Sequence, residues 1–184
     1  MNKFYITYYC GPTEDYVVKP EIIADIAAAG IDLMPLGYST EVNKAILPLL
    51  RRYGIRAIVT DRRMSKVYYE DDFNAVDSTA KEIVEDYAEF DNIEGWDIID
   101  EPCSTKFPIL AAIVNAYRRY SPDKETMINL FPNYASTEQL GTPDYNSHLE
   151  SFVNIVNPHV LSYDHYHFRG RAERKATLDD GNVS

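Results

Sequence analysis

The sequence predicts an α/β fold with parallel strands, in the form of an incomplete (β/α)8 barrel. Six short apolar or β-branched runs alternate with longer amphipathic segments, which is typical of consecutive βα units. Each unit takes roughly 30 residues, and polar or aromatic residues follow most of the runs. A complete barrel needs about 250 residues, with about 200 as the lower end. The 184 residues therefore accommodate about six of the eight units.

The first half of the chain begins with a predicted strand at residues 4–9, where aromatic and β-branched residues favour extended backbone. A helix follows at 20–29, because Pro20 suits a first helical turn and Gly30 suits a helix end. The remaining elements of this half are strands at 31–36 and 55–60 and helices at 41–53 and 78–90, with a long polar loop before the last helix.

The second half opens on a strand at 93–99, which continues into Asp100, Glu101 and Pro102. Residues 107–120 predict a helix, because their apolar side chains recur on one face of a 3.6-residue period. The last predicted elements are a strand at 126–131, a helix at 146–156 and a strand at 160–163.

The predicted domain organisation is one partial barrel over residues 1–168, followed by a polar loop or tail over 169–184. Composition shifts at this boundary to Arg, Glu, Asp, Gly and Lys with few apolar residues. Over the whole chain, hydrophobic residues make up 45% and charged residues 26%, which is ordinary for a globular protein.

Charge and cysteine content exclude several classes of function. A net charge of −11 and a pI near 4.7 repel nucleic acid and anionic membrane surfaces. No apolar run is long enough for a membrane span, and no secretory leader is evident, which leaves the compartment undetermined. Cys10 and Cys103 are too few for a disulfide framework and lack the spacing of a zinc site. We therefore expect free thiols, and neither a cofactor nor a metal ion.

A doubly wound sheet is the alternative fold for six βα units. It requires a glycine-rich phosphate turn after the first strand, whereas residues 11–14 read Gly-Pro-Thr-Glu. A barrel instead places functional side chains at the carboxyl ends of several strands. Such residues follow the predicted strands here: Tyr8, Tyr9, Gly37, Tyr38, Asp61, Arg62, Asp100, Glu101, Asn133, Tyr134, Asp164 and Tyr166.

The most informative stretch is Gly-Trp-Asp-Ile-Ile-Asp-Glu-Pro at residues 95–102, at the end of the fourth predicted strand. It resembles the clan-A retaining glycoside hydrolases, cellulase-like and β-galactosidase-like TIM barrels whose fourth strand ends in Asn-Glu-Pro. The resemblance implies that Glu101 is the general acid/base. Asp100 then occupies the place of an Asn that contacts the sugar 2-hydroxyl. An Asp at that place would also favour a protonated Glu101, provided that the two carboxyls face each other.

The end of the sixth predicted strand adds to the resemblance. Asp164, His165 and Tyr166 resemble the His-x-Tyr of cellulase-like members, with Asp in the place of His. Asp164 and Tyr166 are two residues apart, so both can face the same cleft. A carbohydrate is the implied ligand, and the further candidates for contacting it are Asp61, Arg62, Tyr8, Tyr38 and Trp96.

Several alternatives stay open at this point. Asp100 and Glu101 can simply cap the following helix, Asp61 and Arg62 can form a structural ion pair, and tyrosines are more often packing residues. His165, His167 and Asp61 would be the ligands of a metal-dependent hydrolase.

The expected second carboxylate raises a different question, because the nucleophile of this clan lies on the seventh strand, which the sequence does not contain. A catalytically silent, carbohydrate-binding fragment is therefore the main alternative to an enzyme. Open barrel edges expose unpaired backbone groups, so we also expect self-association.

Overall fold

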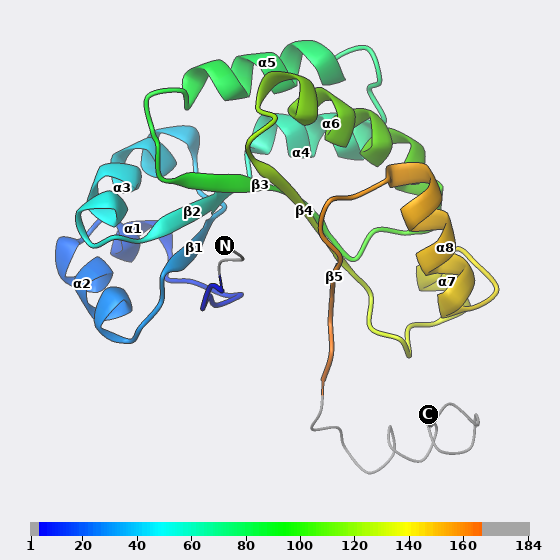
Figure 1. The fold of residues 1–184 in the computed structure, drawn as a ribbon, viewed down its shortest axis with the longest axis horizontal. Coiled ribbons are helices and arrows are strands. Elements are labelled where there is room, and N and C mark those ends of the chain that lie inside the picture. The colour runs from blue at the N-terminus through cyan, green and yellow to red at the C-terminus, as the bar shows by residue number, and fades with distance from the viewer. Residues whose placement is uncertain (1–3, 167–184) are drawn as a thin grey trace.

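The computed structural model describes residues 4–166 as a curled, fully parallel sheet with helices on its outer side (Figure 1). Five strands follow one another in the sheet in the order of the chain. All neighbouring pairs are parallel, and the register sets Asp100 beside Asn129 and Asn129 beside Ser162. The strands are β1 (Leu33–Leu36), β2 (Arg56–Val59), β3 (Ile93–Asp100), β4 (Glu125–Leu130) and β5 (Ser162–Tyr163). The prediction of an incomplete α/β barrel is confirmed.

The helices connect the strands in the expected alternation. Those at or near predicted positions are α2 (Pro20–Ala28), α3 (Thr40–Arg52), α5 (Val76–Asp86), α6 (Phe107–Tyr120) and α8 (Tyr145–Val156). Three short elements were not predicted, namely α1 (Glu14–Val17), the 3-10 turn η1 (Ser104–Lys106) and α7 (Thr137–Leu140). The helix α4 (Arg62–Glu70) replaces much of the predicted polar loop.

The hydrophobic core lies between the sheet and the helices. Along β4, Thr126, Ile128 and Leu130 are buried toward the helices, while the alternate residues Met127 and Asn129 face the inner side of the sheet. This alternation matters for the site, because it places the inner-facing positions of neighbouring strands side by side.

The predicted first strand is wrong, because residues 4–9 form no strand in the structure. Its backbone is joined to the start of β1 at Ile6, whose carbonyl accepts from Asp32 N at 3.1 Å and Leu33 N at 3.3 Å. The Ile6 N–H donates to Asp32 Oδ1 at 2.7 Å, so a side chain takes the donor that a ladder would use. Glu101 consequently follows the third strand of the sheet rather than the fourth.

Helix α4 forms where a loop was expected. Its apolar residues are few, but their spacing is that of one helical face. Met64, Val67 and Tyr68 are buried, and their i, i+3, i+4 spacing forms one short stripe. Asp61 caps the helix by accepting from Arg63 N at 2.9 Å. Because the helix also contains Arg62, Arg63, Ser65, Lys66 and Glu70, the apolar stripe was too weak for the sequence alone to indicate a helix.

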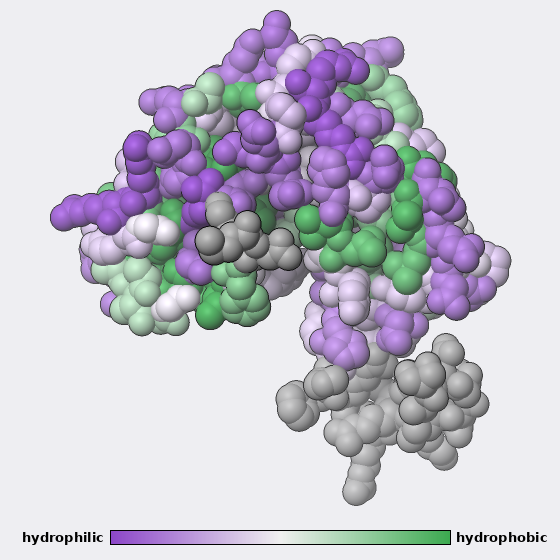
Figure 2. Space-filling model, viewed as in Figure 1, coloured by the Kyte–Doolittle hydropathy of each residue, from purple (hydrophilic) through white to green (hydrophobic). Residues whose placement is uncertain are grey.

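The β5 edge of the sheet is open within the described residues. Leu161 and Tyr163 are 55% and 58% exposed, and a groove of about 530 Å³ runs between this edge and α8. Figure 2 shows hydrophobic residues gathered over this part of the surface. None of the described helices has both the length and the apolar character that crossing a membrane requires.

Candidate active site

Three carboxylates meet at the carboxyl edge of the sheet. Asp100 ends β3 and Glu101 follows it, with Glu101 N donating to the Asn129 carbonyl at 2.8 Å. Asp164 follows β5, and its N–H donates to the Leu130 carbonyl at 3.1 Å. The parallel register therefore brings together residues that are more than 60 positions apart in the sequence.

The side chain of Asn129 connects two of these carboxylates. Its Nδ2 donates to Asp100 Oδ1 and to Asp164 Oδ1, both at 2.9 Å. Its Oδ1 accepts from the Ser162 hydroxyl at 2.7 Å. Every polar atom of the amide thus has a partner, and the two carboxylates are held at a fixed separation.

Two tyrosines complete the hydrogen bonding of the same carboxylates. Tyr9, on the segment before α1, donates to Asp100 Oδ2, and Tyr166 donates to Asp164 Oδ2 at 3.1 Å. The negative carboxylates raise the pKa of both phenols, for each of them first through this hydrogen bond. The hydroxyls consequently stay protonated and keep donating near neutral pH.

Glu101 occupies the most unusual position of the cluster. Its φ of 48° lies in the left-handed region, which a non-glycine residue enters at a cost of about 1 kcal/mol or more. Burial raises the pKa of its carboxyl, and so do the charges of Asp100 and Asp164 and a hydrogen bond with Asp164. A carboxyl that keeps its proton to higher pH is suited to act as an acid.

Asp97 lies deeper on the same inner face of β3 and adds to the negative charge. Thr60 donates to its Oδ2 at 2.9 Å. Burial raises the pKa of Asp97, the Thr60 hydrogen bond opposes that rise, and the Asp100 charge reinforces it. Asp97 thus extends the acidic lining from the rim toward the sheet.

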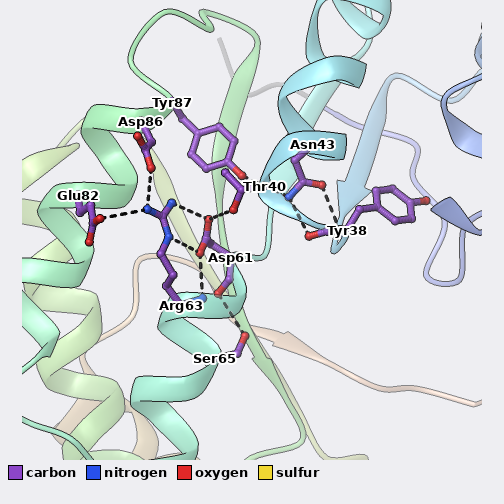
Figure 3. A network of polar contacts seen from close by, with 9 residues as sticks. All are labelled: Tyr38, Thr40, Asn43, Asp61, Arg63, Ser65, Glu82, Asp86 and Tyr87. Carbon is purple, nitrogen blue, oxygen red and sulfur yellow. Dashed lines mark hydrogen bonds and ion pairs between the residues drawn. The ribbon is translucent and has the colours of Figure 1, made fainter.

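Asp61, a predicted sugar contact, is 3% exposed and belongs to a structural network (Figure 3). Its two carboxylate oxygens accept from Arg63 Nε and Nη2, both at 3.0 Å. Arg63 also pairs with Asp86 of α5 at 2.6 Å. These contacts tie α4 to α5, so the ion pair that the sequence left open does form, but with Arg63 rather than Arg62.

Arg62 has a different partner and environment. Its Nη2 lies 3.2 Å from Glu14 Oε1 of α1, and both side chains are exposed. The structure therefore separates the two neighbours, with Asp61 inside the network of Figure 3 and Arg62 on the surface.

Trp96, Tyr8 and Tyr38, which were predicted to contact the sugar, also lie in different environments. Trp96 is 3% exposed, stacks on Tyr117 at 5.1 Å between ring centroids and donates to Ser121 at 2.8 Å, so it is a core residue. Tyr8 and Tyr38 instead lie together under the loop after residue 9. The Tyr38 hydroxyl donates to the Pro12 carbonyl at 2.7 Å, and both rings crowd Gly11. Both side chains therefore pack against residues 11 and 12.

The metal alternative finds no support in residues 4–166, where no three His, Cys, Asp or Glu side chains are arranged to hold an ion. His167, one of its proposed ligands, lies outside the described residues, as does the predicted tail at 169–184.

Sequence reasoning missed Asn129 as a site residue and named Tyr9 only as one of many strand-end residues. Asn129 sits in an ordinary alternating strand, and nothing local marks it. Only the register of β3, β4 and β5 puts its amide between two carboxylates.

Comparison with known proteins gives matches at the level of structure only. No family model matches the chain, and no curated protein sequence does. A proposed alpha-L-fucosidase from Bacteroides thetaiotaomicron superposes with a TM-score of 0.58 and 12% identity, over 94% of this chain and 65% of that one.

Two mannanases superpose in the same way. The endo-1,4-beta-mannanase from Eisenia fetida has a TM-score of 0.59 and 11% identity, over 85% of this chain and 62% of that one. The beta-mannanase from the blue mussel Mytilus edulis has a TM-score of 0.57 and 11% identity, over 83% and 64%. This chain spans less than two thirds of each of these structures. It therefore has the fold of the TIM-barrel glycoside hydrolases, in the form of an incomplete barrel.

Proposed function

We propose that this protein binds a carbohydrate and acts on it as a glycoside hydrolase does, with Glu101 as the general acid/base. The observation that carries the proposal is the place of Glu101, which directly follows β3 with a positive φ and adjoins Asp100, whose side chain Asn129 links to Asp164. The raised pKa of Glu101 agrees with this role. Active sites of such barrels form at this end. The likeness to solved glycoside hydrolases supports the fold on which this argument rests.

The role of Glu101 follows from its protonation. A glycosidic oxygen is a poor leaving group until it receives a proton, and a neutral carboxyl at hydrogen-bond distance can supply one. Asp100 and Asp164 belong to the same cluster, and carboxylate oxygens can accept hydrogen bonds from sugar hydroxyls. Tyr9 and Tyr166, both exposed, can contribute donors and apolar ring surface.

We propose that the second carboxylate of a retaining mechanism is a group other than Asp164. Retaining enzymes hold their two carboxyls about 5 Å apart, with the anomeric carbon between them. Both carboxylate oxygens of Asp164 already accept hydrogen bonds, one from Asn129 and one from Tyr166. We propose that Asp164 supports the acid and that the nucleophile comes from a group outside this cluster.

The test compares the rates at which wild type and a Glu101 variant hydrolyse aryl glycosides. We expect wild type to hydrolyse at least one of the p-nitrophenyl α-L-fucoside, β-D-mannoside and β-D-glucoside substrates, and Glu101→Gln to lose most of that rate. Glu70→Gln, on the exposed end of α4, is the matched control and should keep wild-type rates. Equal rates in wild type and Glu101→Gln would defeat the catalytic role.

Sugar binding without turnover is the second candidate function. It is favoured by the hydrogen bonds that already hold each oxygen of Asp100 and Asp164, and by the lack, within residues 4–166, of an identified nucleophile at the required spacing. In that case fucose, mannose or glucose should perturb the amide NMR signals around Tyr9 and Tyr166 while no aryl glycoside is cleaved.

We further propose that the protein self-associates through the open β5 edge. Exposed Leu161 and Tyr163 and the neighbouring groove present an apolar surface beside an unpaired strand. Such edges readily pair with another chain.

A further inference from the structure

The segment before α1 connects the first strand of the sheet with the acidic cluster. The backbone of Ile6 is hydrogen-bonded to Asp32 and Leu33 at the start of β1. Farther along the same segment, the Tyr9 hydroxyl donates to Oδ2 of Asp100, at the end of β3. The segment therefore reaches from β1 to a carboxylate that is 91 positions away from Tyr9 in the sequence.

The chain is held a second time just before α1. The Tyr38 hydroxyl donates to the Pro12 carbonyl at 2.7 Å. A Cβ at Gly11 would lie 2.7 Å from the ring of Tyr8, so this bend needs a glycine. We call residues 7–11, which lie between the two anchored points, the strap.

The contact of the strap with the acidic cluster lies at the surface. Tyr9 is 71% exposed, and Cys10 and Gly11 are exposed as well. An exposed hydrogen bond contributes little net stability, because water or another hydroxyl can replace the donor. The strap can therefore leave Asp100 without disturbing the anchors on either side of it.

Asp100 accepts from two donors among the described residues, and only one of them is easily replaced. Asn129 Nδ2 donates to Oδ1 of Asp100, and the same amide is also bonded to Asp164 and Ser162 on the next strand. Removing it would break several contacts within the sheet. The Tyr9 hydroxyl, on Oδ2, is thus the donor that another hydroxyl group can displace.

We infer that the Tyr9 hydroxyl holds the strap against Asp100, in the position that a hydroxyl group of a ligand would take. Binding then exchanges one hydroxyl donor for another and frees the strap. The identification of that ligand as a sugar rests on the proposed function, whereas the contact that holds the strap does not.

The first test measures backbone order in the strap, by ¹⁵N relaxation of the full chain. Tyr9→Phe keeps the ring and removes only the hydroxyl, so the order parameters of residues 8–11 should fall from about 0.85 to about 0.6 or less. Asp100→Ala removes the acceptor and should give the same fall, with no further fall in the double variant. Tyr16→Phe, at an exposed tyrosine of α1, is the matched control and should leave the strap ordered.

Unchanged order parameters in Tyr9→Phe, or a strap that is already flexible in wild type, would overturn the inference. A fall in Tyr9→Phe that Asp100→Ala does not reproduce would also count against it, because the order would then depend on another partner of Tyr9. The Tyr9→Phe result stands even if Asp100→Ala does not fold.

The second test titrates L-fucose, D-mannose and D-glucose into wild type and Tyr9→Phe. Removing the competing hydroxyl should lower the Kd of a sugar that binds by about threefold or more. The bound sugar should also lower the order parameters of the wild-type strap to those of the variant. Weaker binding to Tyr9→Phe would show that the phenol holds the sugar and would overturn the displacement. If neither protein binds a sugar, the proposed function and the displacement fail together, while the relaxation data still decide whether Tyr9 holds the strap.

Discussion

At the scale of single residues, Glu101 combines backbone strain with a perturbed carboxyl. Its positive φ lies directly after the last residue of β3, and its N–H is tied to the Asn129 carbonyl. Strained residues of this kind persist where the surrounding structure holds them, and they gather at functional sites. The strain and the raised pKa therefore point to the same residue by independent routes.

The strain predicts a stability difference between two variants that both lack the carboxylate. Glu101→Gly should be more stable than Glu101→Ala by about 1 kcal/mol, because glycine adopts positive φ without a Cβ penalty. Urea unfolding followed by circular dichroism measures the difference. Equal stability, or a more stable Ala variant, would show that the left-handed backbone at residue 101 carries no strain.

The raised pKa of Glu101 also predicts how stability depends on pH. A carboxyl whose pKa is higher in the folded than in the unfolded state stabilises the fold fully below the unfolded pKa, and that contribution is lost as pH rises through the folded pKa. Glu101→Gln should therefore gain stability relative to wild type as pH rises from about 4, near the ordinary pKa of a Glu, to about 8. Urea midpoints at the two pH values test this, with Glu70→Gln as the exposed control. A constant difference across that range would contradict it.

How much of the site was predictable differs between its residues. Glu101, Asp100 and Asp164 were found because each directly follows a run of strand-forming residues, which is a local signal. Asn129 and Ser162 carry no such signal, since their meeting depends on the pairing of three strands. Trp96 was misjudged because periodicity shows that a strand is buried but not which side chains turn toward the helices.

At the scale of elements, the long helices were predictable and the short capped ones were not. Helix α6 has the same bounds in sequence and structure because seven buried residues repeat on its inner face. Residues 4–9 have strand-like composition, yet the Ile6 N–H donates to the Asp32 side chain instead of to a strand backbone, and no strand forms. Helix α4 depends on the Asp61–Arg63 network of Figure 3, which only tertiary contacts complete.

That network predicts unequal effects for two adjacent arginines. Arg63→Leu leaves the buried Asp61 carboxylate without its main partner and should reduce the free energy of unfolding by about 3 kcal/mol. Arg62→Leu breaks only an exposed pair with Glu14 and should reduce it by less than about 1 kcal/mol. Chemical denaturation of both variants provides the comparison. Similar losses in the two would contradict the structural role assigned to Asp61.

At the scale of the whole molecule, the described residues form an open half-barrel. Curling brings the carboxyl ends of β3, β4 and β5 together, which is enough to assemble the acidic cluster (Figure 1). The same openness leaves the two-residue strand β5 as an edge, with apolar side chains over it (Figure 2). The acidic cluster and the exposed β5 edge thus both follow from the open half-barrel.

The open edge predicts concentration-dependent association. Light scattering should show a mass above 21.1 kDa that rises across micromolar concentrations, because exposed Leu161 and Tyr163 lie beside a strand edge that is open within residues 4–166 and favour contact with a second copy. Leu161→Lys should weaken the association, whereas Tyr69→Lys, an exposed aromatic on α4, should not. A wild-type monomer at all these concentrations would argue against the β5 edge as an interface.

The central claim is that Glu101 donates a proton to the glycosidic oxygen as the leaving group departs. It is tested most directly by measuring how the rate depends on the leaving group. Wild type and Glu101→Gln are compared on the phenyl and 2,4-dinitrophenyl glycosides of whichever sugar is cleaved. Phenolate needs a proton to depart, so the variant should lose about 100-fold or more on the phenyl glycoside. Dinitrophenolate departs unaided, so the loss there should stay below about tenfold. Equal losses on both substrates would contradict the account.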